Sequence, residues 1–267
     1  MDAADNAAGI EAARDCFEVE PGLAYLDAAT YGLPPRRTVE TLERALRRWQ
    51  RGTADWVEEW DREGEACRAL FAAIVGCPER EVALVPAVSV AVGLVAAALP
   101  EADEVVVPDD EFSSVLFPAL VAEEARKARV RQVPFADLAA AIGPSTDLVA
   151  FSLTRSQDGA TADLGGIVAG AARHGARVLV DATHAVPFVP LAEHLPGIDF
   201  LVCHGYKHLL CPRGVAFLTV RPERWLEVPP WFANWRSAAP LYGDSYGGPL
   251  SLPATAARYD VSLAWHA

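Results

Sequence analysis

Short apolar runs alternate with helical stretches through most of this chain, and this alternation is the feature that most limits its fold. From residue 82 onward the β-type runs consist mainly of Val, Leu and Ile without alternating polar residues. Such runs are typical of strands buried on both faces of a mostly parallel sheet. We therefore predict an α/β fold with a mostly parallel, seven-stranded sheet sandwiched by helices. The predicted strands cover residues 82–85, 105–107, 130–133, 148–152, 178–180, 200–203 and 215–220.

Helical stretches precede the first strand and fill most gaps between the later strands. After a Pro-Pro pair, apolar residues recur at helical spacing from Val39 to Trp49, with Arg and Glu on the opposite face. A second helix is predicted from about residue 56 to residue 75, because Gly76 is a typical residue for a helix end. Further helices are expected over residues 90–98, 113–127, 138–142 and 164–174.

The composition narrows the classes of partner. A formal net charge of −13 would repel phosphate backbones, so we expect no nucleic acid partner. The apolar runs end before the ~18–20 residues that a membrane-spanning helix needs, so we expect no membrane partner. The first twenty residues are acidic and Ala-rich, whereas a secretory signal has a basic start and an apolar run. These features predict a cytoplasmic protein.

The cysteines and histidines do not form a metal-binding pattern. The five cysteines are odd in number, spread along the chain and free of any CxxC pair, so we expect reduced thiols. His204 and His208 are four residues apart, but no third ligand lies near them in the sequence. We therefore expect no metal site. The chain also lacks the GxGxxG and Walker-type runs of nucleotide-binding proteins.

Polar residues at the predicted strand ends are the first candidates for a functional site, since ligands of such sheets bind beyond the carboxyl ends of the strands. Asp181 directly follows the run 178–180. An aspartate there could hold a proton on a heteroaromatic nitrogen, and it could equally cap a turn or a helix. Both interpretations of Asp181 stay open from its position alone.

Lys207 follows the predicted strand 200–203 in the segment His-Gly-Tyr-Lys. A lysine after a strand is usually a solvated surface residue. Its neighbours favour a place near the ligand edge of the sheet, where partial burial would lower its pKa from the ordinary ~10.4. A neutral amine would then be available for imine exchange and proton transfer.

Several short motifs together resemble the class V aminotransferase family, which includes cysteine desulfurases and isopenicillin-epimerase-like proteins. They are Asp-x-x-His at 181–184, Asp-Phe at 199–200, Gly-Tyr-Lys at 205–207 and Pro-Arg-Gly at 212–214, with Tyr-Leu-Asp-Ala-Ala-Thr at 25–30. The resemblance implies the type I fold of transferases that depend on pyridoxal 5'-phosphate (PLP). The implied division is an N-terminal segment 1–30, a large PLP-binding domain 31–230 and the start of a truncated C-terminal region 231–267.

The same resemblance implies roles for individual residues. Lys207 would carry PLP as a Schiff base, Asp181 would pair with the pyridine nitrogen, and His184 would lie near the phenolic oxygen of the cofactor. His204 and Tyr206 match positions that contact the phosphate or the lysine-bound cofactor.

Two further family positions match residues at predicted helix starts. One is the turn before the helix at 90–98, and the other is the residue before the helix at 113–127. Val88 and Ser89 would bind the phosphate, and a helix start after a strand is independently a suitable anion site. Ser89 could also be an ordinary helix cap. Phe112 would stack on the pyridine ring, although a core phenylalanine is the competing interpretation.

The pattern departs from the family at two short motifs and, more widely, in the smaller C-terminal domain that family members have after residue 263. Ser156 stands where desulfurases carry an asparagine beside the cofactor oxygen, which leaves that contact in doubt and makes Arg155 a weak candidate for a carboxylate or phosphate partner. The stretch 258–263 resembles the segment from which a dimer partner reaches the phosphate. Ser262 and Leu263 replace its Gly-Thr pair.

The resemblance implies a PLP-dependent transferase or lyase that acts on an amino acid and forms a homodimer. Catalysis would proceed through the Schiff base on Lys207, with the proton moved by the freed amine. The alternative is a shortened, non-catalytic PLP-fold module that serves in binding or dimerisation. The retained Asp181, Lys207 and phosphate turn favour the enzyme, whereas the missing C-terminal domain that the resemblance implies favours the module.

Overall fold

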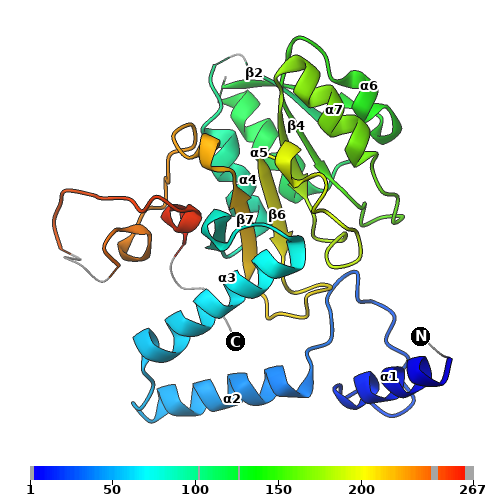
Figure 1. Ribbon diagram of the computed structural model, residues 1–267, viewed down its shortest axis with the longest axis vertical. Coiled ribbons are helices and arrows are strands. Elements are labelled where there is room, and N and C mark those ends of the chain that lie inside the picture. Colours follow the sequence, from blue (N-terminus) through cyan, green and yellow to red (C-terminus); the bar gives the residue numbers. More distant parts are fainter. Residues whose placement is uncertain (1–2, 102, 126, 242–245, 262–267) are drawn as a thin grey trace.

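A seven-stranded sheet forms the centre of the protein, as seen in the computed structural model, which describes residues 3–101, 103–125, 127–241 and 246–261 (Figure 1). The spatial order of the strands is β1-β7-β6-β5-β4-β2-β3. Their bounds are β1 (Val82–Val85), β2 (Asp103–Pro108), β3 (Ala128–Val133), β4 (Thr146–Ser152), β5 (Arg177–Asp181), β6 (Phe200–His204) and β7 (Ala216–Val220).

The sheet is mixed but mostly parallel. Every pairing from β3 to β6 is parallel, and β7 runs antiparallel to both of its neighbours, β1 and β6. The predicted seven-stranded, mostly parallel α/β fold is therefore confirmed. The parallel arrangement brings the carboxyl ends of β2, β4, β5 and β6 to one edge of the sheet, where ligands of such folds bind.

Helices cover both faces of the sheet. Alternate residues of β2 point to opposite faces, so Val106 packs in one apolar cluster while Val105 and Val107 pack in the other. Helices α4 and α5 contribute to the second cluster, and α3, α6 and α7 contribute to the first (Figure 1). The helix bounds are α1 (Ala3–Asp15), α2 (Arg36–Gln50), α3 (Arg62–Val75), α4 (Val88–Ala97), α5 (Ser113–Glu124), α6 (Leu138–Ala141) and α7 (Leu164–His174).

The helix expected over residues 56–75 has two parts. A wider π-helical turn, Trp56–Asp61, precedes α3, and the carboxylate of Asp55 accepts from the amides of Val57 and Glu58 at its start. The helix ends as expected at Gly76, whose φ of 86° is the left-handed conformation that glycine adopts without strain.

The two end regions of the described chain differ in how they contact the body of the protein. Helix α2 has no buried residue and lies outside the body of the protein (Figure 1). Near the other end, the amide of Val261 donates to the carbonyl of Leu84, and Asp260 accepts from the amide of Leu84. These bonds cover the outer edge of β1, which would otherwise expose unpaired backbone groups.

Among the residues that the structure describes, no helix is both long enough and apolar enough to span a bilayer.

Candidate active site at the carboxyl ends of the strands

Lys207 lies in the turn between β6 and β7, and its side chain points into the protein rather than into solvent. Only 7% of the residue is exposed, and its Nζ lies 2.7 Å from Nε2 of His184. His184 follows β5, the neighbour of β6 in the sheet. The structure therefore brings the predicted lysine and histidine together from two adjacent strand ends.

Asp181 is the last residue of β5 and is buried beside this pair. Its Oδ1 accepts from the amide of Thr183 at 2.9 Å and from the Thr183 hydroxyl at 2.5 Å. The same hydroxyl accepts from the amide of His204 at 3.0 Å, so it ties the end of β5 to the end of β6. The sequence motifs did not identify Thr183 as a site residue, although Asp-x-Thr is a spacing at which the side chains form local hydrogen bonds.

Burial sets the protonation of these groups. It lowers the pKa of Lys207, while the charge of Asp181 opposes that shift. Burial, and then the charge of Lys207, lower the pKa of His184 to about 4. Burial raises the pKa of Asp181, against the hydrogen bonds from Thr183 and the charge of Lys207. A neutral imidazole whose Nε2 carries no proton can accept a hydrogen bond from the ammonium form of Lys207.

Helix α4 begins beside these residues, and its N-cap residue has no polar side chain. Ala87 occupies the cap position and offers no side-chain acceptor to the first turn. The amide of Val88 donates a hydrogen bond to Nε2 of His204 at 3.4 Å. Ser89 is exposed at the same helix start. A helix start whose N-cap residue offers no acceptor suits an anionic group.

His204 and Tyr206 lie side by side at this helix start. Their rings meet edge to face with centroids 4.6 Å apart, and the Arg213 guanidinium lies 5.2 Å from the centre of the Tyr206 ring. Burial, followed by the charge of Lys207, lowers the pKa of His204 to about 4. The predicted phosphate-side residues are thus adjacent, with one fixed positive charge near them.

Phe112 reaches the site from the end of β2. The Nζ of Lys207 lies 5.4 Å from the centre of its ring. At 47% exposure Phe112 is not a core residue, which removes the competing interpretation of this position. Its neighbour Glu111, which the sequence did not single out, accepts hydrogen bonds from both the amide and the hydroxyl of Ser152 at the end of β4.

Ser156 and Arg155 lie in the turn after β4, and both line a pocket of about 330 Å³ that also touches Phe112. Arg155 is held by Asp110 at 2.8 Å and by Asp158 at 3.1 Å. Because two carboxylates already neutralise this guanidinium, the structure does not favour it as a receptor for a substrate carboxylate or a phosphate. Ser156 is exposed in the turn.

The N-terminal segment 25–30 leads directly onto the lysine turn. The amide of Gly32 donates to the carbonyl of Tyr206 at 2.9 Å. A Cβ at position 32 would overlap the carbonyl oxygen of Lys207 and the side chain of Leu210. Glycine is therefore required here because the lysine turn approaches its Cα closely, and not because of its backbone angles. Sequence patterns do not reveal such a contact.

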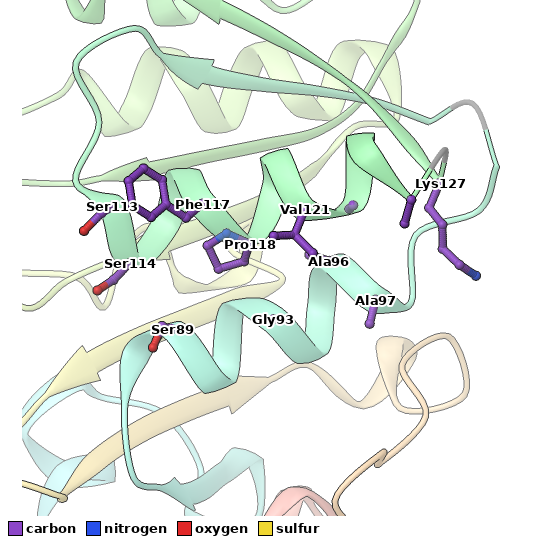
Figure 2. Close-up of a pocket in the computed structure, with 12 residues that line it drawn as sticks. Ser89, Gly93, Ala96, Ala97, Ser113, Ser114, Phe117, Pro118, Val121 and Lys127 are labelled. Carbon is purple, nitrogen blue, oxygen red and sulfur yellow. The ribbon is translucent and has the colours of Figure 1, made fainter.

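A groove of about 560 Å³ runs between α4 and α5 from the same helix start. Ser89 and Ser113 lie at one end of it and Lys127 at the other, as Figure 2 shows. Its apolar wall includes Phe117 and Val121, which are 60% and 63% exposed.

Among the described residues, no group of three His, Cys, Asp or Glu side chains is arranged to hold a metal ion.

A sequence profile described as aminotransferase class V matches residues 24–234, and the chain belongs to this family. Two curated relatives are similar to it over long stretches. Isopenicillin N epimerase of Streptomyces clavuligerus is 31% identical over 186 residues, which are 65% of this chain and 47% of that protein. A probable cysteine desulfurase of Aeropyrum pernix is 28% identical over 230 residues, 80% of this chain and 56% of that protein.

Solved structures of other proteins share the fold of this chain. The cystine C-S lyase C-DES, in complex with its product cysteine persulfide, superposes with a TM-score of 0.81 at 23% identity and covers 92% of this chain and 70% of that one. An apo cysteine desulfurase from Thermococcus onnurineus NA1 gives 0.80 at 19% identity, covering 96% and 67%. The chain spans about half the length of these two curated relatives.

Proposed function

We propose that this chain binds PLP covalently at Lys207 and forms the cofactor-binding part of an enzyme that acts on an amino acid. The observation that carries the proposal is the arrangement at one sheet edge of a buried lysine, a buried aspartate and a helix start whose N-cap residue offers no acceptor. Each group suits a different part of PLP: the aldehyde, the ring nitrogen and the phosphate. Membership of the class V aminotransferase family and the PLP named for a structural relative, a C-DES variant, add support.

The residues present fit the cofactor. Lys207 would attach the aldehyde, and Asp181 would pair with the ring nitrogen, since Thr183 occupies Oδ1 and leaves Oδ2 as the available oxygen. Val88, Ser89, His204 and Tyr206 would surround the phosphate. PLP supplies an electron sink that weakens the bonds at the α-carbon of a bound amino acid.

Side chains of the protein would hold and transfer the protons. The lowered pKa of Lys207 increases the fraction of neutral amine, which is the form that attacks a carbonyl and accepts a proton. His184 offers an acceptor at Nε2 and so fixes where the Lys207 ammonium points. Asp181 would hold a proton on the ring nitrogen. We propose a transferase or lyase on this basis, in keeping with the named activities of the relatives.

We also propose that the protein is a homodimer in the cytoplasm. The exposed apolar wall of the α4–α5 groove gives a second copy a surface to cover, next to the helix start proposed for the phosphate (Figure 2). Phe117→Asp is expected to reduce the mass measured by light scattering, whereas Leu226→Asp, at an exposed position outside the groove, is not. The cysteines are free thiols, as a reducing compartment would keep them.

The lysine content of the chain makes the cofactor test direct. The sequence contains only two lysines, Lys127 and Lys207. The purified protein would be mixed with PLP, reduced with borohydride and digested, and the peptide carrying the cofactor would be identified by mass spectrometry. Lys207→Ala removes the proposed attachment point, and Lys127→Ala is the matched control on the far end of the α4–α5 groove.

The expected result is a visible absorbance band in the wild type and in Lys127→Ala, with the reduced cofactor on Lys207. Lys207→Ala should show neither the band nor the label. If the wild type takes up no PLP, the non-catalytic module becomes the better description. If the label falls on Lys127, the proposed site is wrong.

A further inference from the structure

Glu111 joins the ends of two strands through one carboxylate. Its Oε2 accepts from the amide of Ser152 at 2.7 Å, and its Oε1 accepts from the Ser152 hydroxyl at 2.5 Å. The amide of Phe112 also donates to Oε1, at 2.7 Å. One side chain therefore fixes the loop after β2 to the last residue of β4, and at the same time fixes the backbone of the residue that follows it.

Phe112 depends on this backbone anchor because its ring has little packing to hold it. The residue is 47% exposed, yet its ring lies 5.4 Å from the Nζ of Lys207. Its carbonyl accepts from the amides of Val115 and Leu116 and so begins α5. With its amide held by Glu111 and its carbonyl held by the helix, the main chain fixes the Cα–Cβ bond from which the ring extends towards Lys207.

The anchor is continuous with Asp181. Ser152 lies directly opposite Asp181 in the parallel pairing of β4 with β5, and the amide of Leu153 donates to the Asp181 carbonyl at 2.9 Å. The chain of contacts from Glu111 through Ser152 thus places Phe112 and Asp181 in one rigid frame. These two residues approach the site from strands that are not neighbours, since β4 lies between β2 and β5.

A carboxylate is an unfavourable choice for this place if packing is its only task. Burial raises the pKa of Glu111, the hydrogen bonds from Ser152 and Phe112 lower it, and the nearby charge of Asp181 raises it further. An apolar side chain would fill the space without that opposition. The two oxygens supply what an apolar residue lacks, which is three directed hydrogen bonds.

We propose that Glu111 is a positioning residue that holds the Phe112 ring against the cofactor face beside Lys207. This inference rests on the proposed binding of PLP at Lys207. Ser152 is its partner in the same role, and the ring of Phe112 is the group that would touch the cofactor.

The neighbouring Asp110 offers a matched control. It ties the same loop to the turn after β4 through Arg155 at 2.8 Å and Gln157 at 2.9 Å. Asp110 is exposed, and solvent screens its ion pair. Asp110→Asn therefore perturbs the outer tether of the loop while the contacts of Glu111 remain.

The experiment compares the visible circular dichroism of protein-bound PLP in the wild type, Glu111→Gln, Asp110→Asn and Phe112→Ala, each divided by the amount of cofactor bound. This signal reports how asymmetrically the protein holds the cofactor ring. Glu111→Gln should lower the signal towards that of Phe112→Ala and raise the Kd for PLP by about tenfold, as expected for loss of hydrogen bonds to a charged group. Asp110→Asn should stay within about twofold of the wild type, in line with the small effects of exposed ion pairs.

The outcomes separate the two proposals. If Glu111→Gln lowers the Tm but leaves the signal per bound cofactor and the Kd unchanged, Glu111 is only structural and the inference is overturned. If the wild type takes up no PLP, the proposed function fails and takes this inference with it. Should Glu111→Gln fail to fold, Ser152→Ala removes a single hydrogen bond of the same network and is expected to lower the signal in the same direction. An unchanged signal in Ser152→Ala would then overturn the inference.

Discussion

The Nζ of Lys207 lies 2.7 Å from Nε2 of His184, and burial keeps that imidazole neutral, with a pKa of about 4. The ammonium form of Lys207 is therefore stabilised by an acceptor, while burial disfavours it. His184→Leu should keep the burial and remove the acceptor. We expect the pKa of Lys207 to fall by about one to two units, because a hydrogen bond to a charged group contributes about 1.5–3 kcal/mol.

The measurement is the pH dependence of the initial rate at which the protein captures PLP. The rate rises with pH as Lys207 loses its proton, so a lower pKa moves the rise to lower pH in His184→Leu. His184→Gln retains an acceptor oxygen and should keep the wild-type profile. A shift of His184→Leu to higher pH would show that the imidazole does not stabilise the ammonium.

A second pH effect concerns stability and His204. Burial, and then the charge of Lys207, lower its folded pKa from 6.5 to about 4. Between these values the unfolded chain binds a proton that the folded protein does not, so stability is full above about pH 6.5 and falls as the pH is lowered through this window. His204→Gln should lose about 1–2 kcal/mol less than the wild type between pH 7 and pH 5.

Urea unfolding at several pH values checks this expectation. Asp181 and Glu111 have raised pKa values and act in the opposite direction, so the difference between the variant and the wild type is the informative quantity. Parallel curves for the two proteins would show that His204 is protonated in the folded state at the same pH as in the unfolded chain.

Gly32 provides a steric test of the lysine turn. A Cβ at this position would overlap the Lys207 carbonyl oxygen, which is backbone and cannot rotate away. Gly32→Ala should therefore displace the turn and slow PLP capture at least about tenfold, by analogy with small misplacements of reactive groups. Gly143→Ala meets no atom within 4 Å and is the control. Equal capture rates in both variants would mean that the N-terminal segment moves freely away from the turn.

Most of the fold could be predicted from the sequence because its strands are buried on both faces. A continuous apolar run bounded by turns marks such a strand without knowledge of its partners. The helix predicted over residues 164–174 has the bounds of α7, and in the structure Asp163 caps its start while Gly175 ends it in the left-handed conformation. The positions of Lys207, Asp181 and His184 at strand ends followed from the same pattern.

Contacts between distant residues could not be predicted in this way. Glu111 and Ser152 are 41 positions apart, and their contact requires β2 and β4 to be neighbours, which local patterns do not state. Gly32 resembles any glycine before a Pro pair until the lysine turn is placed against it. The division of the chain at residues 30 and 230 stays a prediction.

The stretch 258–261 makes its contacts with residues of its own chain. The resemblance assigned this region to a segment that reaches a dimer partner, and its Ser262 and Leu263 lie outside the described residues. Asp260, which is 3% exposed, pairs with the buried Arg68 at 2.7 Å and caps the edge of β1 through the amide of Leu84. The segment is thus anchored on its own chain.

Replacing Asp260 by Asn should leave the Arg68 guanidinium buried with Glu65 as its one ionic partner among the described residues. Breaking a buried pair from one side typically costs about 3–5 kcal/mol, and we expect the lower end because Glu65 remains. Glu58→Gln removes an exposed pair with Arg62 and should change the free energy of unfolding by less than about 1 kcal/mol. Urea unfolding measures both variants. A loss below about 1 kcal/mol for Asp260→Asn would mean that Glu65 alone satisfies Arg68, and that the C-terminal segment covers β1 without stabilising it.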